Sequence, residues 1–564
     1  MEALDWLVIG VFFLALIGII VWVVRQKQND SADYFLGGRD ATWLAIGASI
    51  FASNIGSEHL IGLAGAGASS GMAMAHWEIQ GWMILILGWV FVPFYSRSMV
   101  YTMPEFLERR YNPQSRTILS VISLVSYVLT KVAVTVYAGG LVFQQVFGIK
   151  ELWGIDFFWI AAIGLVVLTA LYTIFGGMKS VLYTSVLQTP ILLLGSLIIL
   201  VLGFKELGGW DEMMRVCGAV TVNDYGDTMT NLIRSNDDAN FPWLGALIGS
   251  AIIGFWYWCT DQFIVQRVLS GKNEKEARRG TIFGAYLKLL PVFLFLIPGM
   301  IAFALHQKYI GAGGEGFLPM LTNGTANADA AFPTLVAKLL PAGVKGLVVC
   351  GILAALMSSL ASLFNSSAML FTIDFYKRFR PETPEKKLVG IGQIATVVIV
   401  ILGIIRIPIM RSVGDVLYTY LQDVQSVLAP GIAAAFLLGI CWKRTSAQGG
   451  MWGLIAGMII GLTRLGAKVY YSNAGEVADS TFKYLFYDMN WLFFCGWMFL
   501  FCVILTIVVS LCTKAPEAGK IQGLVFGTAT PEERAATRAS WNHWDVIHSV
   551  IILGITAAFY WYVW

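Results

Sequence analysis

The sequence predicts an all-α polytopic membrane protein with about fourteen transmembrane helices, two inverted five-helix repeats and discontinuous helices at the bilayer midplane. Three observations predict this fold class. Of 564 residues, 57% are hydrophobic and 13% are charged, a balance far from that of a soluble domain. Apolar runs of about 20 residues, each long enough to cross a hydrocarbon core, recur along the whole chain. Two of these runs are interrupted by polar residues, as broken membrane helices are.

The apolar runs indicate a single transmembrane domain over residues 1–564. The run from Leu4 to Val24 is too long for a signal-peptide core, so we expect 4–24 to stay as an extra first helix. We interpret 43–204 and 242–441 as the first and second inverted repeat, and 446–563 as additional C-terminal helices. The expected spans are 4–24, 43–72, 74–96, 117–147, 157–176, 181–204, 242–266, 281–305, 344–373, 388–405, 413–441, 446–463, 490–512 and 543–563.

The distribution of charge predicts the orientation, because cytoplasmic loops of membrane proteins collect Lys and Arg. Most of the 38 basic residues fall after the odd-numbered spans, above all in 109–116, 272–279 and 377–387, whereas the 205–240 loop is acidic. We therefore expect a multi-pass cell-membrane protein with both termini on the outer side. The net charge of +3 is too small to indicate nucleic-acid binding. We expect the protein to contact the lipid bilayer, and no segment indicates an obligate protein partner.

The two interrupted runs predict where a binding site lies. The second span contains Ala52 to His59, with Asn54, Gly56 and Ser57 in the middle, and the seventh contains Gly254 to Gln262. Non-helical backbone at membrane depth is tolerated only against protein or a water-filled cavity. Paired breaks in corresponding positions mark the site of inverted-repeat transporters, and these two lie five spans apart.

A face of small residues in the ninth span predicts a cation site. Ala355, Ser358, Ser359 and Ser362 recur at helical spacing. Such hydroxyls often serve only to pack helices together. Beside a broken helix, however, two hydroxyls and the backbone carbonyls near Ala52 and Ile55 would form an oxygen cage suited to sodium rather than a transition metal. The sequence has no phosphate loop, nucleophile elbow or metal-ligand cluster, so it does not predict an enzyme.

Polar and aromatic residues inside the other spans indicate a polyhydroxylated ligand. Carboxylates and amides bond hydroxyls, and an aromatic face covers the C–H face of a sugar ring. Lys131 and Lys288 also lie within apolar spans, where each needs either a buried ion pair, an interfacial position or a functional role. The intramembrane set is His59, Trp77, Glu78, Gln80, Tyr257, Trp258, Asp261, Gln262, Lys288, Gln422 and Gln425.

Several of these segments resemble the sodium/glucose cotransporters of the solute:sodium symporter family, over about residues 30–515. The similar stretches are Gly47–Ser57, Trp256–Gln262, Met357–Leu360, Phe364–Ser366 and Phe371–Asp374. The resemblance implies sodium-coupled sugar symport by alternating access, with sodium as the co-transported ion. It places sugar contacts at Asn54, His59, Glu78, Tyr257, Trp258, Lys288 and Gln422. It places sodium at the carbonyls of Ala52, Ile55 and Ala355 and the hydroxyls of Ser358 and Ser359.

The chain departs from its relatives at a few positions. Gly254 stands where relatives have a polar side chain near the sugar, and Ser185 and Ala361 stand where two-sodium members have Asp and Thr. We therefore expect one sodium per sugar. The absence of a long Cys-rich external insertion favours a bacterial source. Import of glucose or galactose is the leading hypothesis, and symport of myo-inositol or another solute and a sugar-gated channel or sensor are the alternatives.

Overall fold

The computed structural model describes residues 1–26, 28, 30–56, 58–321, 324–410, 417–474 and 478–563. Ser57 and residues 413–416, which belong to the expected broken span and to the span at 413–441, lie outside the described residues. The first half of the chain contains α1 (Ala3–Val24), α2 (Ser31–Leu36), α3 (Trp43–Asn54), α4 (Ala64–Ser70), α5 (Ala75–Glu78), α6 (Gly81–Ile86), α7 (Val92–Ser98), α8 (Met103–Arg110), α9 (Pro113–Ser126), α10 (Ala133–Phe147), the hairpin β1 (Glu151–Leu152) and β2 (Ile155–Asp156), α11 (Phe157–Leu207) and α12 (Trp210–Gly218).

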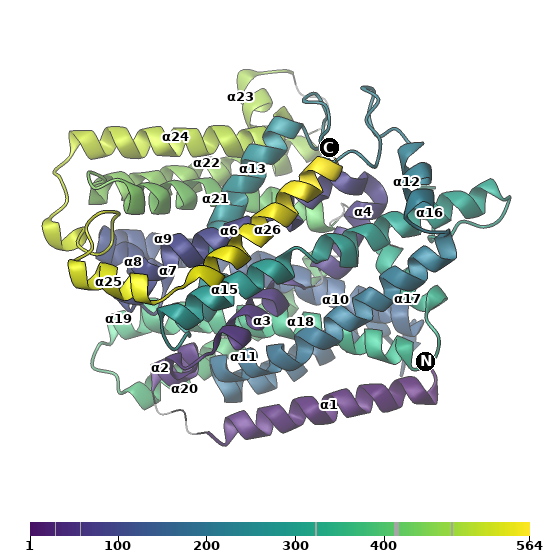
Figure 1. Cartoon of the computed structure of the whole chain (residues 1–564), viewed down its shortest axis with the longest axis horizontal. Helices are drawn as coiled ribbons and strands as arrows, with labels where there is room; N and C mark the ends of the chain where they lie inside the picture. The colour runs from purple at the N-terminus through teal and green to yellow at the C-terminus, as the bar shows by residue number, and fades with distance from the viewer. Residues whose placement is uncertain are drawn as a thin grey trace.

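The second half is likewise helical. It contains α13 (Trp243–Phe255), α14 (Gln262–Leu269), α15 (Glu274–Lys288), α16 (Ile297–Gly311), α17 (Ala331–Leu339), α18 (Val344–Met369), α19 (Lys377–Phe379), α20 (Glu385–Met410), α21 (Leu417–Cys441), α22 (Ala447–Asn473), α23 (Thr481–Lys483), α24 (Trp491–Cys512), α25 (Pro531–Ala539) and α26 (His543–Tyr562). Figure 1 shows these helices packed side by side, with α1 along one edge.

The helical membrane fold is confirmed, but the count of fourteen spans is not. Among the described residues, twelve helical segments are long and apolar enough to cross a membrane. Two of them each join runs that the sequence analysis separates, namely 58–98 and 157–207. Within 157–207 the chain is bent at Gly177, whose φ of 53° and ψ of −150° are not helical. Hydropathy separates the two runs at this bend, although helical structure is present on both sides of it.

Both predicted breaks are present. Helix α3 ends at Asn54, and Ile55 is extended with ψ 98°, so the last carbonyls of α3 lack the amides that a continuing helix would supply. The second break is at Asp261, with φ −75° and ψ 127°, between the π-helical segment η6 (Trp256–Thr260) and α14. Two further π-helical segments, η2 (Glu58–Leu63) and η5 (Tyr127–Val132), lie beside these breaks: η2 follows the first, and Tyr127 and Lys131 of η5 bond to Asp261 at the second. Single π-helical turns are frequent at functional sites.

Hydrogen bonds tie the loops together at the two ends of the bundle. At one end, Lys308 donates to the Leu207 carbonyl (3.0 Å), Trp210 donates to the Tyr562 hydroxyl (2.9 Å), and Asp5 accepts from the Gly343 amide (2.7 Å). The first and last helices therefore have their free ends on the same side as the acidic 205–240 loop. At the opposite end, Arg116 pairs with Asp374 and Lys377 with Glu385.

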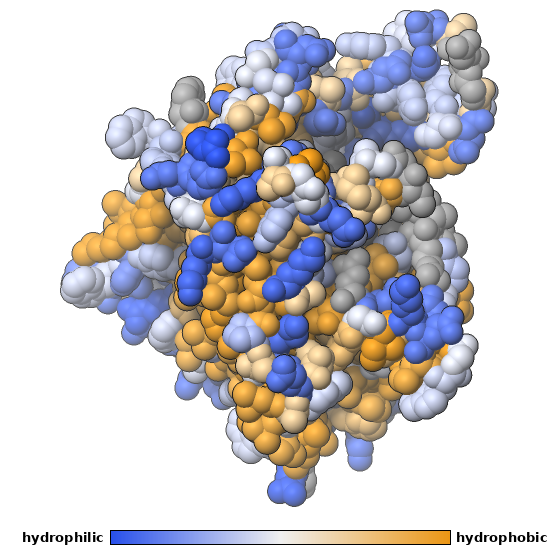
Figure 2. All heavy atoms as spheres, turned by 90° about the vertical axis from the view of Figure 1, so that its right-hand side faces the viewer, coloured by the Kyte–Doolittle hydropathy of each residue, from blue (hydrophilic) through white to orange (hydrophobic). Residues whose placement is uncertain are grey.

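The helices at the periphery present apolar side chains outward. In α1 and α26 only 22% and 17% of the most apolar window is buried, and exposed residues include Leu7, Leu14, Val550 and Ile551. A helix with so much exposed apolar surface is suited to contact with lipid. Figure 2 views the right-hand side of Figure 1, where hydrophilic side chains gather over the hydrophobic body of the protein. The chain is thus a multi-pass membrane protein.

Candidate functional site

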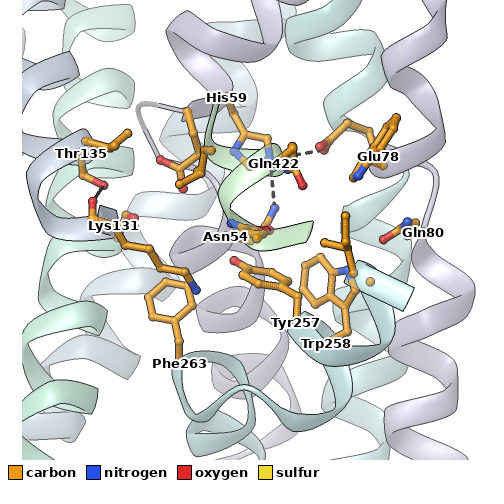
Figure 3. Close-up of a pocket in the computed structure, with 18 of the residues that line it drawn as sticks. Asn54, His59, Glu78, Gln80, Lys131, Thr135, Tyr257, Trp258, Phe263 and Gln422 are labelled. Atoms are coloured by element: carbon orange, nitrogen blue, oxygen red, sulfur yellow. Dashed lines mark hydrogen bonds and ion pairs between the residues drawn. The ribbon is translucent and has the colours of Figure 1, made fainter. Parts of the chain in front are cut away.

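A cavity lies between the two broken spans. All seven residues predicted to contact the ligand line it, together with Ser359 of the predicted cation site. They come from the consecutive elements α3, η2 and α5 in the first half of the chain and from η6, α15, α18 and α21 in the second half. Figure 3 labels six of the seven, Asn54, His59, Glu78, Tyr257, Trp258 and Gln422. The lining is Asn54, Glu58, His59, Trp77, Glu78, Gln80, Lys131, Val134, Thr135, Ile253, Gly254, Tyr257, Trp258, Phe263, Lys288, Ser359, Leu363, Leu421, Gln422 and Gln425.

A chain of polar contacts fixes one wall of the cavity. The Lys288 ammonium lies 2.6 Å from Glu78 Oε2, and His59 Nε2 lies 3.3 Å from the same oxygen. The Asn54 amide nitrogen in turn lies 3.3 Å from His59 Nε2. Glu78 and Lys288 are buried, so each charge needs the other in this apolar setting. Lys288 is therefore an ion-pair partner that also faces the cavity.

Aromatic rings and unsatisfied polar atoms complete the lining. The Tyr257 and Trp258 rings meet edge to face with centroids 4.9 Å apart, and Figure 3 shows the Tyr257 ring below Asn54. Among the described residues, Trp77 Nε1 and Gln422 Oε1 are buried without a hydrogen-bond partner. A buried polar atom without a partner costs about 1–3 kcal/mol. A ligand with hydroxyl groups would satisfy both atoms.

The serine face of α18 packs against the broken end of α3. Ala355, Ser358, Ser359 and Ser362 are all buried. The Ser362 hydroxyl lies 2.6 Å from the Ser53 hydroxyl. A Cβ placed on Gly56 would be 2.9 Å from Ser359 Oγ, so this hydroxyl directly adjoins the break after Ile55. The structure therefore places Ser359 of α18 beside the break in α3, next to the ligand cavity.

Lys131 has a partner that the sequence analysis did not identify. Its ammonium lies 2.8 Å from Asp261 Oδ2, at the second helix break. Tyr127 donates to the same carboxylate, and Asp261 also accepts from the Phe263 amide (3.3 Å). The ammonium lies 4.8 Å from the ring centroids of both Tyr257 and Phe263, within the range of cation–π attraction. Lys131 thus connects η5 to the broken seventh span at the wall of the cavity.

Sequence reasoning missed some of the lining and included residues that lie elsewhere. Gln80 and Gln425 were recognised as intramembrane polar residues but not as ligand contacts, and both line the cavity. Thr135 follows Lys131 by one helical turn, a spacing that could have identified it. Gln262, by contrast, accepts from the Met103 amide at 2.8 Å and does not line the cavity.

The comparisons with known proteins identify the family of the chain. Residues 34–457 match the Sodium:solute symporter family. The chain is 35% identical to sodium/glucose cotransporter 4 of Danio rerio, over 96% of this chain and 84% of that protein. It is 37% identical to sodium/glucose cotransporter 2 of Rattus norvegicus, over 94% and 81%. It is also 36% identical to sodium/myo-inositol cotransporter 2 of Mus musculus, over 94% and 80%.

A solved structure shows the same fold. A Na⁺-coupled sialic acid symporter in a substrate-bound outward-open state superimposes with a TM-score of 0.72 at 22% sequence identity, covering 92% of this chain and 99% of that one. The fold, the two helix breaks and the family match all indicate a sodium-coupled transporter. The chain belongs to the sodium:solute symporter family, and is a membrane transporter that couples a small-molecule solute to sodium rather than an enzyme.

Proposed function

We propose that this protein imports a monosaccharide such as glucose or galactose together with sodium, by alternating access. The observation that carries the proposal is the composition of the cavity. It combines a shared carboxylate at Glu78, unpaired polar atoms on Trp77 and Gln422, and the Tyr257 and Trp258 rings. A neutral ligand with many hydroxyl groups fits this lining better than a charged one.

The same geometry supports a route for coupling. Ser359 belongs to the lining of the solute cavity and to the oxygen cage that we propose for sodium, with Ala52, Ile55, Ala355 and Ser358. Both ligands would therefore be held between α3 and α18. An ion that joins these helices favours the conformation in which the solute contacts are assembled, and the effect on affinity is reciprocal.

Symport of myo-inositol is the second candidate. A relative named as a sodium/myo-inositol cotransporter is as similar to this chain as those named for glucose. Inositol has hydroxyl groups on every ring carbon, so the same lining suits it. Uptake of labelled glucose, galactose and myo-inositol into liposomes, under imposed sodium, potassium or proton gradients, separates the two. Sodium-driven uptake of inositol but of neither sugar would contradict the sugar assignment.

Gln422→Ala is expected to weaken sugar affinity at least about tenfold, because the variant loses the buried amide that is proposed to bond a sugar hydroxyl. The half-saturating sugar concentration for sodium-driven uptake measures this. Gln393→Ala is the matched control, since Gln393 donates to the Ile174 carbonyl at 3.1 Å outside the cavity. Equal affinity in the two variants would remove Gln422 from the site.

One sodium ion is expected to move with each sugar. Ser185 stands between Ser358 (3.3 Å) and Ser49 (3.4 Å), so this place offers hydroxyls but no carboxylate to balance a second cation. One ion suffices, because a tenfold gradient supplies about 1.4 kcal/mol and 100 mV about 2.3 kcal/mol. Reversal potentials at several sodium and sugar gradients measure the ratio. A slope for two charges per sugar would contradict the expectation.

We also propose that both termini face outward. The basic clusters at 109–116, 272–279 and 377–387 then lie in the cytoplasm, as charge bias requires. Labelling of a tag beside residue 1 in intact cells tests the orientation.

A further inference from the structure

Gln80 reaches the cavity because the chain departs from a regular helix just before it. In an α-helix, residues two apart point to different sides. Here α5 ends at Glu78 and α6 begins at Gly81, with Ile79 (ψ 21°) and Gln80 (ψ 26°) outside helical geometry between them. Glu78 and Gln80 therefore both line the cavity. The interruption adds a second polar side chain to the wall that carries the Glu78 carboxylate.

The space for the Gln80 amide exists because residue 254 has no side chain. A Cβ placed on Gly254 would lie 2.4 Å from Gln80 Oε1 and 2.9 Å from its amide carbon. Both distances are far below van der Waals contact. Any other residue at position 254 would thus displace the amide from its present position. Gly254 and Gln80 therefore form a matched pair. Gly254 in α13 has no side chain, and the Gln80 side chain, from the turn between α5 and α6, fills the space that a side chain at position 254 would occupy.

Hydrogen bonding fixes which end of the amide faces the ligand. Gln80 Nε2 donates to the Ser250 carbonyl at 2.9 Å, and a carbonyl can only accept, so the nitrogen must be on that side. The amide oxygen is left on the other side, and Figure 3 shows it turned toward the centre of the cavity. Gln80 is 2% exposed, so its orientation is held by packing as well. The cavity wall therefore presents one fixed, neutral hydrogen-bond acceptor.

We propose that Gln80 is a specificity-determining residue that accepts a hydrogen bond from one hydroxyl of the transported solute, and that Gly254 provides the room for it. The inference rests on the proposed transport of a sugar or polyol. A site built to bond a hydroxyl discriminates strongly against a solute that lacks it, because the buried acceptor is then left unpaired. Gln80 would thus select for a hydroxyl group at one position of the solute, in addition to the hydroxyl group that Glu78 is proposed to bond.

Single-deoxy analogues of the transported sugar test this role. Gln80→Ala is expected to raise the half-saturating concentration of the parent sugar about tenfold, as loss of one buried hydrogen bond does. For the one analogue that lacks the bonded hydroxyl, wild type and variant are expected to have equal affinity. Gln393→Ala, outside the cavity, leaves both affinities at wild-type values. An equal loss for the parent and every analogue would indicate a merely structural effect and overturn the proposal.

A second variant tests the pairing with Gly254. Gly254→Ala is expected to weaken parent-sugar affinity as much as Gln80→Ala does, and the double variant is expected to be no worse than either alone. Fully multiplicative losses would show that the two positions act separately and would overturn the pairing. Absence of sodium-driven uptake of any sugar or polyol by the wild type would overturn the proposed function itself. Uptake with no selective loss in the variants overturns the role of Gln80 alone.

Discussion

Lys131→Met is expected to destabilise the protein by about 3–5 kcal/mol, because it leaves the buried Asp261 carboxylate without its ion-pair partner. Asp261→Asn is expected to have a similar effect by stranding the Lys131 ammonium among aromatic rings. The double variant removes both charges and should be less destabilised than the two single losses combined. Melting midpoints of the purified protein in detergent measure stability, and uptake at a temperature well below those midpoints measures function.

An exposed ion pair provides the matched control. Lys377 and Glu385 lie 3.0 Å apart with side chains 34% and 45% exposed, so Lys377→Met should change stability by no more than about 1 kcal/mol. Similar melting midpoints for the Lys131 and Lys377 variants would contradict the role of the buried pair. Additive losses in the double variant would show that Lys131 and Asp261 are not coupled.

Ser359→Ala is expected to raise the sodium concentration needed for half-maximal uptake at least about tenfold. The variant removes one of the oxygen atoms proposed to surround the ion, and alanine offers no oxygen in its place. Sodium titration of sugar uptake in liposomes, at saturating sugar, measures the effect. The protein should stay folded, since only one hydroxyl is lost.

The same helix offers a control. Ser367 is also buried in α18, and its hydroxyl has no hydrogen-bond partner among the described residues. Ser367→Ala makes the same chemical change two turns further along α18, and its sodium requirement should stay at the wild-type value. The sodium site would have to lie elsewhere if the two variants had the same sodium requirement.

The parts of the fold that local patterns determine were predicted from the sequence. Both breaks were visible because Asn54 and Asp261 lie inside otherwise apolar runs, where they cannot face lipid. The serine face of α18 followed from the helical period alone. The number of spans was not confirmed, since a bend such as Gly177 leaves the helical hydrogen bonding on either side intact. Hydropathy reports polarity along the chain rather than the continuity of its hydrogen bonds.

The parts of the site that depend on distant contacts were not predicted. Lys131 and Asp261 are 130 residues apart, and the sequence around each residue does not indicate which residue it pairs with. Gln80 was recognised as an intramembrane polar residue but was not among the sugar contacts that the resemblance implies. The interruption between α5 and α6 brings it to the same cavity as Glu78. The contacts of Asn54, His59, Tyr257 and Gln422 stay predictions, and their common position around one cavity supports them.

The π-helical segments η2, η5 and η6 supply His59, Lys131 and Tyr257 to the cavity. Each such turn accommodates one residue more than an α-helical turn, so the helix on either side keeps the faces that it would have without the extra residue. Deleting one residue there would restore regular hydrogen bonding without rotating the flanking helices. Evolution could therefore have built this site by single insertions into helices that were already packed. Shortening one of these segments should give a more heat-resistant protein that no longer transports, since stability and activity then oppose each other.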